Sequence, residues 1–580
     1  MKEKEETDIQ LKQNEEFLRK AYRAAVIPCM LSILSGCINI LADGILVGQK
    51  IGTKGLAAIN LCVPVYLILC IIGSFFVSGG AICCSQEIGN NQKEQAQKYY
   101  SAALWTCLVA SLLMAVLGIL FSGPIAALLC ADEAVRPMVL DYTRVTLVGA
   151  ITKIMIYIPF WFLRLEGKNK SVTAMMVLMG AGNVLLDMVF LFWFQMGVFG
   201  AALASVIATA AACILGFARL HGTGSSFRCS FSVPDRECLE NIAAAGSPAA
   251  MNNLFQTLRL LCINALLMKY GGNQLVAVFT VINGVGAFAE AVTSGVSQAG
   301  AAMLGVYHGE HDNESARILI RCEVRSGIFY SIVFGICIVA GAGLIRTAYG
   351  IDVSMYIPMF CIAVSLIPAM WSNVLSSYYN VSGHASLANL LIFCKVFVFS
   401  VASLFLLLKA QMIPWLFLSI GELLTILLWV WVTGIVHRKN KETSRFLLMD
   451  RTLENAGKVI NFSIMSDEAA ICDASEKITA FCEVNGMQRK QVMRVSLALE
   501  ELMVLITQLN QPIQVSFDIR VFSLQDVIGI RIRYDGKKFN PLINEDTEDE
   551  KYMGVQMIQK MVEEVLYQRT FGMNTLMVLI

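Results

Sequence analysis

Charge is scarce in this sequence. Asp, Glu, Lys and Arg make up 15% of its 580 residues, while 56% are hydrophobic and the mean hydropathy is +0.63. Soluble domains carry about 25% charged residues. The 45 basic and 44 acidic residues nearly cancel, so no basic excess indicates a nucleic-acid partner. The composition therefore predicts a protein embedded in a lipid bilayer.

Metal-ligand spacings and a cleavable leader are missing too. The eighteen Cys residues are scattered through apolar runs such as LSGCINIL, so we interpret them as small hydrophobic residues in reduced surroundings. His308 and His311 are the only close His pair and lie in a charged loop without a third ligand, which predicts no metal site. Residues 1–20 are charged and lack a small-residue cleavage site, which predicts a cytoplasmic segment rather than a signal peptide.

Apolar stretches of about 20 residues, long enough to cross a bilayer, recur along the chain. A polar break at 221–241 separates two sets of six, which predicts an N-terminal lobe at 21–220, a cytoplasmic linker, and a C-terminal lobe at 242–437. The predicted spans are 24–47, 56–79, 101–122, 137–163, 171–194, 199–219, 242–268, 275–305, 318–345, 353–379, 386–408 and 412–436.

Basic residues collect in alternate connections, as the positive-inside rule requires. One of the predicted inside loops holds Arg164, Lys168 and Lys170, whereas the predicted outside connection QMGVFG holds no basic residue. This alternation predicts a multi-pass protein of the cell membrane with both termini in the cytoplasm.

The two sets of six spans resemble one another at a fixed offset along the chain. Pro28 matches Pro248, Gly52 matches Gly272, and Gly89 matches Gly309. Both halves begin inside and contain an even number of spans, so the repeats are parallel. The predicted fold class is an all-α membrane protein of twelve helices in two six-helix lobes, with a C-terminal cytoplasmic α/β domain. Two such lobes are typical of an alternating-access carrier.

Asp187 lies in the middle of the apolar run GNVLLDMVFLF. A carboxylate inside a membrane span is costly and usually marks an ion or substrate path. This run, with VIPCMLSILSGCINILADGILVGQKIG, FLRLEGKNKS and GAALASVIA, resembles the multidrug and toxic compound extrusion (MATE) carriers, in the branch of the DNA-damage-inducible-F-type proteins. The resemblance covers about residues 20 to 437. It implies a bacterial exporter of organic, often cationic, compounds in exchange for H⁺ or Na⁺.

Carried over residue by residue, the resemblance implies an ion and substrate site at Asp43, Asn183, Asp187 and Ser205. Asn183 and Asp187 are four residues apart and therefore share one helix face. A buried carboxyl group next to a second one holds a proton more readily than one in water. We therefore expect the two Asp residues to exchange protons, with Na⁺ as the rival coupling ion because the same oxygens suit a hard cation. The alternatives are that Asp43 reaches interfacial water, that Asp187 is only a structural hydrogen-bond partner, and that Asn183 and Ser205 only pack helices.

The C-terminal lobe departs from one branch of the family, which places acids in its first and fourth spans. Here Glu290 and Glu422 are interpreted as the only carboxylates well inside that lobe. Glu290 is a possible C-lobe site residue, and the alternative is an internal pairing with Arg259. Because interior spans offer mainly Arg259 as a positive group, the sequence favours a cationic cargo.

After a linker at 438–462, residues 463–580 read as a small α/β domain of alternating helices and strands. ALEEL, YDGKKFNP and MGVQMIQKMVEEV resemble the ATP-binding fold of histidine kinases and anti-sigma-factor kinases. The resemblance implies nucleotide-contacting positions at Glu501, Asp535, Gly536 and Gly554. Leu505 replaces the Asn that holds magnesium and Tyr552 replaces the first glycine of the glycine box. We therefore expect a degenerate domain without productive Mg-ATP binding, and no cofactor or enzymatic activity in the chain.

Three functions remain open on the sequence. The first is an exporter of a small organic cation, regulated by a cytoplasmic protein that binds the tail. The second is a flippase for lipids or lipid-linked sugars, which shares the two-lobe plan. The third is a membrane sensor that signals through its tail.

Overall fold

The computed structural model describes residues 2–130, 132–133, 135–222, 225–230, 234–349, 353–439, 444–449, 458–524, 527–537, 540, 557, 562, 564–571 and 573–580. They form two compact units. The membrane body comprises Ala24–Asp312 and Ile320–Thr433, and the tail unit comprises Met1–Arg23, Asn313–Leu319 and Gly434–Ile580. We describe each unit by itself.

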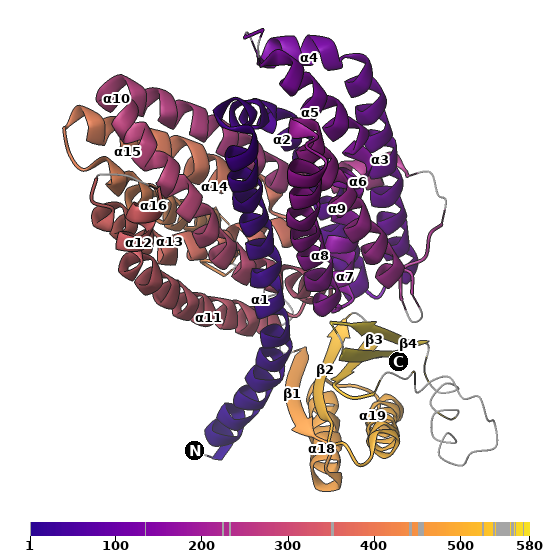
Figure 1. Cartoon of the computed structure of the whole chain (residues 1–580). Coiled ribbons are helices and arrows are strands. Elements are labelled where there is room, and N and C mark those ends of the chain that lie inside the picture. Colours follow the sequence, from indigo (N-terminus) through magenta and orange to yellow (C-terminus); the bar gives the residue numbers. More distant parts are fainter. Residues whose placement is uncertain are drawn as a thin grey trace. The chain divides into compact units, whose positions relative to one another are not determined.

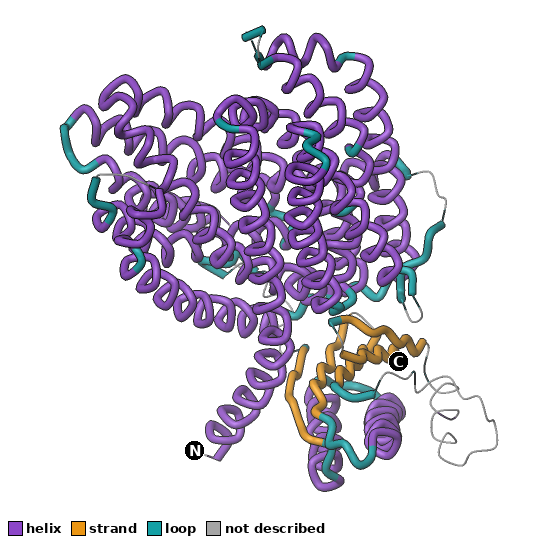
Figure 2. The backbone as a smooth tube through the Cα atoms, viewed as in Figure 1, coloured by secondary structure: helices purple, strands orange, loops and turns teal. Residues whose placement is uncertain are grey.

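Apolar runs without helix breakers build the membrane body almost entirely from helices (Figures 1 and 2). The first bundle contains α1 (Lys2–Ile51), α2 (Thr53–Gly89), α3 (Lys93–Leu120), α4 (Ser122–Leu129), α5 (Arg136–Val148), α6 (Ala150–Met155), α7 (Tyr157–Leu165), α8 (Asn169–Asp187), the π-helix η1 (Met188–Trp193) and α9 (Gly197–Leu220). The second contains α10 (Arg236–Gly309), α11 (Asn313–Ala340), α12 (Ala342–Tyr349), α13 (Tyr356–Val381), α14 (Ala385–Ile392), the π-helix η2 (Phe393–Phe399), α15 (Ser400–Lys409), the short 3₁₀ helix η3 (Pro414–Leu416) and α16 (Phe417–Lys439).

Ten helices among the described residues are long and apolar enough to span a bilayer, and the bent pair α5 and α6–α7, which turns by 55°, makes an eleventh. These eleven coincide with eleven of the predicted spans. The other predicted span, 242–268, is helical as the first arm of α10 but does not pass the same test. Its polar residues Asn252, Asn253, Gln256 and Arg259 lower its hydropathy. The structure therefore shows a mostly helical, polytopic fold, and the number twelve stays a prediction.

The backbone reproduces the repeat seen in the sequence. Gly52 precedes α2 with φ +80°, and its match Gly272 breaks α10 with φ +64°. Only glycine adopts such backbone angles without a steric cost. Asn91 and His311, which are related by the same offset, also have positive φ values of 63° and 52°. A π-helical segment also occurs in the fifth predicted span of each half, η1 at its end and η2 nearer its start.

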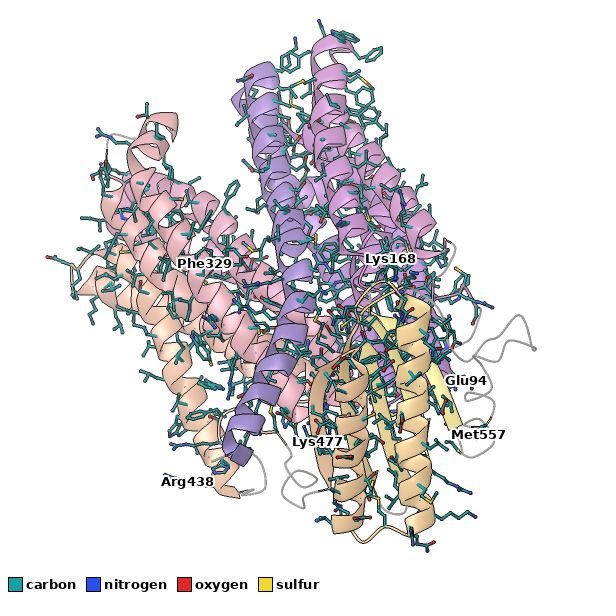
Figure 3. The ribbon with its side chains drawn as sticks, turned by 90° about the horizontal axis from the view of Figure 1, so that it is seen from below. Glu94, Lys168, Phe329, Arg438, Lys477 and Met557 are labelled. Carbon is teal, nitrogen blue, oxygen red and sulfur yellow. The ribbon has the colours of Figure 1, made fainter. Side chains whose placement is uncertain are left out.

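The tail unit contains a five-stranded sheet in the order β1-β2-β3-β5-β4, with every neighbouring pair antiparallel. Its elements are β1 (Val459–Met465), α18 (Glu468–Val484), α19 (Arg489–Asn510), β2 (Ser516–Leu524), β3 (Val527–Tyr534), β4 (Glu564–Thr570) and β5 (Met573–Leu579). Alternate strand residues such as Phe517, Ile519 and Ile532 form one core with Leu499 and Leu502 of α19. Figure 3 shows α18, which carries Lys477, running beside α19.

The sequence missed β1, because VINFSIM lies across the predicted boundary between linker and domain. The helix expected over MGVQMIQKMVEEV lies largely outside the described residues, and so do Tyr552 and Gly554.

Candidate functional site

An acidic pair lies where α8 widens into a π-helix. Asp187 is the last residue of α8 and is fully buried, and the Asn183 side chain one turn earlier donates a hydrogen bond from Nδ2 to Asp187 Oδ2 at 3.0 Å. Single π-helical turns interrupt the regular backbone ladder and are frequent at functional sites. The amide therefore orients one carboxylate oxygen, and the second oxygen, Oδ1, is buried without a hydrogen-bond partner among the described residues.

Asp43 approaches this carboxylate from α1. The two carboxyl groups lie within hydrogen-bonding reach of one another, although they come from the first and fifth predicted spans. Two ionised carboxylates have only acceptors, so a hydrogen bond between them needs one bound proton. The structure thus brings Asp43, Asn183 and Asp187 together into a site that can take up and release one cationic charge.

A cavity of about 200 Å³ opens beside this acidic pair within the first bundle. Asn183 and Ser205 are on its wall, so the structure places all four predicted residues in or next to one site. The lining comprises Asn39, Tyr66, Leu69, Cys70, Lys153, Ile156, Tyr157, Phe160, Met176, Met179, Asn183, Ser205 and Thr209. Aromatic rings and Met side chains with a few polar groups are typical of sites for small organic molecules.

Lys153 lines the candidate site and was missed by the sequence reasoning. It lies on α6 with 8% of its surface exposed, and its Nζ donates to the Ser205 hydroxyl at 3.3 Å. The same ammonium lies 5.5 Å from the centre of the Tyr66 ring and interacts electrostatically with Asp43. The signal was present, because a lone lysine inside the predicted span 137–163 is as costly in a membrane as Asp187.

The second bundle holds a counterpart in which the charges are directly paired. Lys395 of η2 lies 3.5 Å from Glu422 of α16 and donates to Asn373 Oδ1 at 2.7 Å. Ser372 donates to the other Glu422 oxygen at 2.9 Å. A carboxylate held by a lysine and a hydroxyl is already neutralised, so Glu422 is poorly suited to bind a mobile cation.

Glu290 lies on the second arm of α10, and its side chain is exposed. It accepts a hydrogen bond from Gln256 at 2.9 Å. Between these described residues there is no ion pair of Glu290 with Arg259, so the predicted alternative is wrong. Gln256 is one turn before Arg259 on the same arm and reaches the carboxylate instead.

Glu323 corrects a second expectation, that Glu290 and Glu422 are the only carboxylates inside the C-terminal lobe. It lies on α11 with no exposed surface, and neither side-chain oxygen has a hydrogen-bond partner within the described part of the chain. The carboxyl group fills the space above Gly300 of α10, where even a Cβ atom would overlap it.

Arg164, which the sequence placed in an inside loop, is buried on α7. Its side chain is 5% exposed, donates to Ser32 Oγ at 2.9 Å and to Gln298 Oε1 at 2.7 Å, and stacks on the Phe160 ring at 4.0 Å. With Lys153 and Lys395, it gives the interior three basic groups besides Arg259. The sequence argument that a scarcity of interior positive charge favours a cationic cargo is therefore weaker than expected.

The two bundles meet through glycines near the helix ends that are predicted to be cytoplasmic. A Cβ on Gly79 of α2 would overlap the carbonyl oxygen of Ile242, and one on Gly246 of α10 would lie 1.9 Å from the carbonyl oxygen of Phe75. Gly89 and Gly309 approach one another in the same way. By contrast, a Cβ on Gly286, in the middle of the second α10 arm, would have no described atom within 4 Å. We call the four touching glycines the glycine crossing.

The nucleotide-like residues of the tail are engaged by the protein itself. Asp535 accepts a hydrogen bond from the backbone of Ser516 at 2.8 Å and pairs with Lys20 of α1 at 2.5 Å within the tail unit. Gly536 packs against the Asn510 side chain. Leu505, in the place of the magnesium ligand, is buried in the tail core, while Glu501 is half-buried.

Comparisons with known proteins show what the membrane body is similar to. Residues 28–193 match the MatE family model. The multidrug export protein MepA of Staphylococcus haemolyticus is 26% identical over 326 residues, which cover 55% of this chain and 70% of that protein. MepA of Staphylococcus aureus strain MRSA252 is 25% identical over 318 residues, which cover 54% of this chain and 68% of that protein.

Solved structures share the fold. A MATE in complex with MaL6 and an outward-facing multidrug resistance MATE family transporter each match with a TM-score of 0.69 at 20% identity, covering 73% of this chain and 97% of the other. A MOP superfamily transporter from Pyrococcus furiosus matches with a TM-score of 0.68 at 20% identity. The membrane body is thus similar in sequence to the MatE family model over residues 28–193 and to multidrug export proteins, and it shares the fold of MATE family transporters.

Proposed function

We propose that this chain exports small organic compounds across the cell membrane in exchange for H⁺ or Na⁺, with the acidic pair as the coupling site. The observation that carries the proposal is the approach of Asp43 to the fully buried Asp187. Burial and a neighbouring like charge both favour a carboxyl group that carries a cation or proton. The relatives are multidrug export proteins, which supports small organic molecules as cargo.

Alternation between two states supplies the mechanism. The glycine crossing closes the predicted cytoplasmic end, and the cavity lies in the first bundle beside the acidic pair. Binding of the coupling ion changes the charge next to that cavity and so changes its affinity for a cargo. A ligand shifts a two-state equilibrium only by its differential affinity for the two states. The coupling ion and the cargo therefore need to compete for the same charged site, and the acidic pair beside the cavity allows this competition.

The proposal is tested by flux of the fluorescent cation ethidium in vesicles that contain the purified chain, under an imposed proton or sodium gradient. Asp187→Asn keeps the shape of the side chain and removes its charge, so gradient-driven flux is expected to fall at least tenfold. Asp141→Asn, an exposed acid on α5, is the matched control and is expected to retain flux. Equal flux for both variants would refute the coupling role of Asp187.

Cargo charge is the second part of the proposal. The acidic pair favours a cationic cargo. Because the interior also contains basic groups, the same flux assay is repeated with an anionic, lipid-linked cargo. Flux of a fluorescent anion or a lipid probe in place of ethidium would favour the flippase. Binding of a compound without flux of any probe would favour the sensor.

The tail is proposed to regulate the transporter rather than hydrolyse ATP. Lys20, which pairs with Asp535, and Asp43 both belong to α1, so the tail is linked to the helix that carries half of the acidic pair. A chain truncated after Lys439 is expected to retain gradient-driven flux with an altered rate. Complete dependence of flux on added Mg-ATP would contradict this view of the tail.

A further inference from the structure

Lys153 places a basic side chain at the edge of the proposed coupling site. Lys153 belongs to α6, and the groups around it come from four other helices. Because protein interiors are closely packed, moving its side chain away from the site would require these helices to repack. The charged and titratable groups that face it are Asp43 of α1, Tyr66 and Cys70 of α2, and Tyr157 of α7, with the Ser205 hydroxyl of α9 as its hydrogen-bond partner.

The two candidate coupling ions respond differently to such a charge. A hard metal cation needs several oxygen ligands at once, and any sodium ion that used the Ser205 hydroxyl would lie next to the ammonium that donates to the same oxygen. A sodium ion at the acidic pair would also lie in the electrostatic range of the ammonium, which repels it. A proton needs one carboxylate oxygen and no ligand shell. The Oδ1 atoms of Asp43 and Asp187, which accept no hydrogen bond from any described residue, provide that oxygen.

The second bundle offers an internal comparison. There Lys395 contacts Glu422 directly at 3.5 Å, so its ammonium takes the place that a cation would occupy beside the acid. In the first bundle, the Lys153 ammonium donates to the Ser205 hydroxyl and lies over the Tyr66 ring, and among the described residues it forms no ion pair within 4 Å with Asp43 or Asp187. Glu422 is thus neutralised by a direct ion pair, whereas Asp43 and Asp187 only experience the electrostatic field of Lys153.

We propose that Lys153 is a specificity-determining residue that makes the acidic pair a proton site and excludes Na⁺ from it. This inference rests on the proposed function, because it assigns the ion for the same site. It is tested with a sodium-binding measurement that does not require transport.

The experiment compares thermal unfolding of the purified full-length chain in NaCl and in choline chloride at equal ionic strength and fixed pH. Lys153→Met is expected to gain a sodium-dependent rise in melting temperature, with a half-maximal Na⁺ concentration at least about tenfold below that of the natural chain, which corresponds to about 1.4 kcal/mol. Lys153→Arg keeps the charge and is expected to stay insensitive to Na⁺. Lys153→Gln replaces the methionine variant if the latter does not fold.

Two controls identify the site. Adding Asp187→Asn to Lys153→Met is expected to abolish the gained sodium response, because the response needs the acidic pair. The double variant Lys395→Met with Glu422→Gln removes the ion pair of the second bundle and is expected to gain no response. The inference is overturned if the natural chain responds to Na⁺ as strongly as Lys153→Met, or if the response persists without Asp187. Loss of ethidium flux in every gradient would instead count against the proposed function, whatever the sodium binding.

Discussion

The glycine crossing gives the sharpest test of the two-state mechanism. Gly246→Ala would place a Cβ 1.9 Å from the carbonyl oxygen of Phe75, about 1.5 Å short of ordinary van der Waals contact. The obstacle is backbone of α2 rather than a flexible side chain, so the two helices have to separate. Forced overpacking of this kind costs about 1–3 kcal/mol. In the proposed alternating-access mechanism the crossing closes one state only, so the cost falls on that state and shifts the equilibrium away from it by about 5–150-fold.

Amide hydrogen exchange followed by mass spectrometry in lipid nanodiscs measures this shift. Exchange in the peptides that cover positions 74–89 is expected to speed up in Gly246→Ala, since local opening exposes these amides. Ethidium flux is expected to fall because closure becomes rare. Gly286→Ala is the matched control, since it adds the same atom to the same helix α10 where no described atom lies within 4 Å. Unchanged exchange in Gly246→Ala, or an equal change in Gly286→Ala, would refute the reasoning.

Three further predictions concern buried positions. Gly300→Ala is expected to destabilise the chain by about 1–3 kcal/mol in a thermal unfolding assay. Adding Glu323→Ala is expected to recover part of this loss, because it removes the overlapping carboxyl group. If the stability losses of the two single variants simply add in the double variant, the contact is contradicted. Leu505→Asn restores the residue type of a magnesium ligand but buries an amide in the tail core. It is expected to lower the stability of the tail by about 1–3 kcal/mol and to leave Mg-ATP unbound. Binding of Mg-ATP to this variant in a calorimetric titration would overturn the view of a degenerate site. Burial raises the pKa of Cys482 from 9.0 to about 11, so its thiol is expected to stay protonated and unreactive toward iodoacetamide at pH 8. The folded tail is also expected to lose stability as the pH rises from 9 toward 11, because the unfolded chain releases this proton first. Rapid alkylation of Cys482 in the folded chain at pH 8 would contradict this.

Features that recur at a fixed spacing along the chain were predictable from the sequence. Span length and hydropathy located eleven of the membrane helices, and the constant offset between the halves identified Gly52 with Gly272 and Gly89 with Gly309, each pair of which has an equivalent structural role. The eighteen Cys residues all lie in the described part of the chain and form no disulfide, as their apolar surroundings indicated. The four-residue spacing of Asn183 and Asp187 likewise fixed a shared helix face, on which they form a hydrogen bond.

Contacts between distant segments were not predictable in this way. The sequence treated Lys153 as part of an apolar run, Arg164 as a loop residue and Glu323 as unremarkable, yet all three are buried. A single chain shows which residue types lie in a span but not which way each side chain points across it. The pairing of Lys395 with Glu422, and of Gln256 rather than Arg259 with Glu290, depends on helix rotation.

The sequence alone therefore determined that the chain is a two-part repeat of membrane helices with an acidic residue in a costly place, because hydropathy, charge placement and repeat spacing are properties of short stretches. The family resemblance placed Asp43 in the same site as this acid, but only the tertiary structure decided that the two carboxyl groups come within hydrogen-bonding reach and that a lysine lies beside them. The reason is that these neighbours lie on separate helices, and their approach is set by how the helices pack rather than by any local pattern.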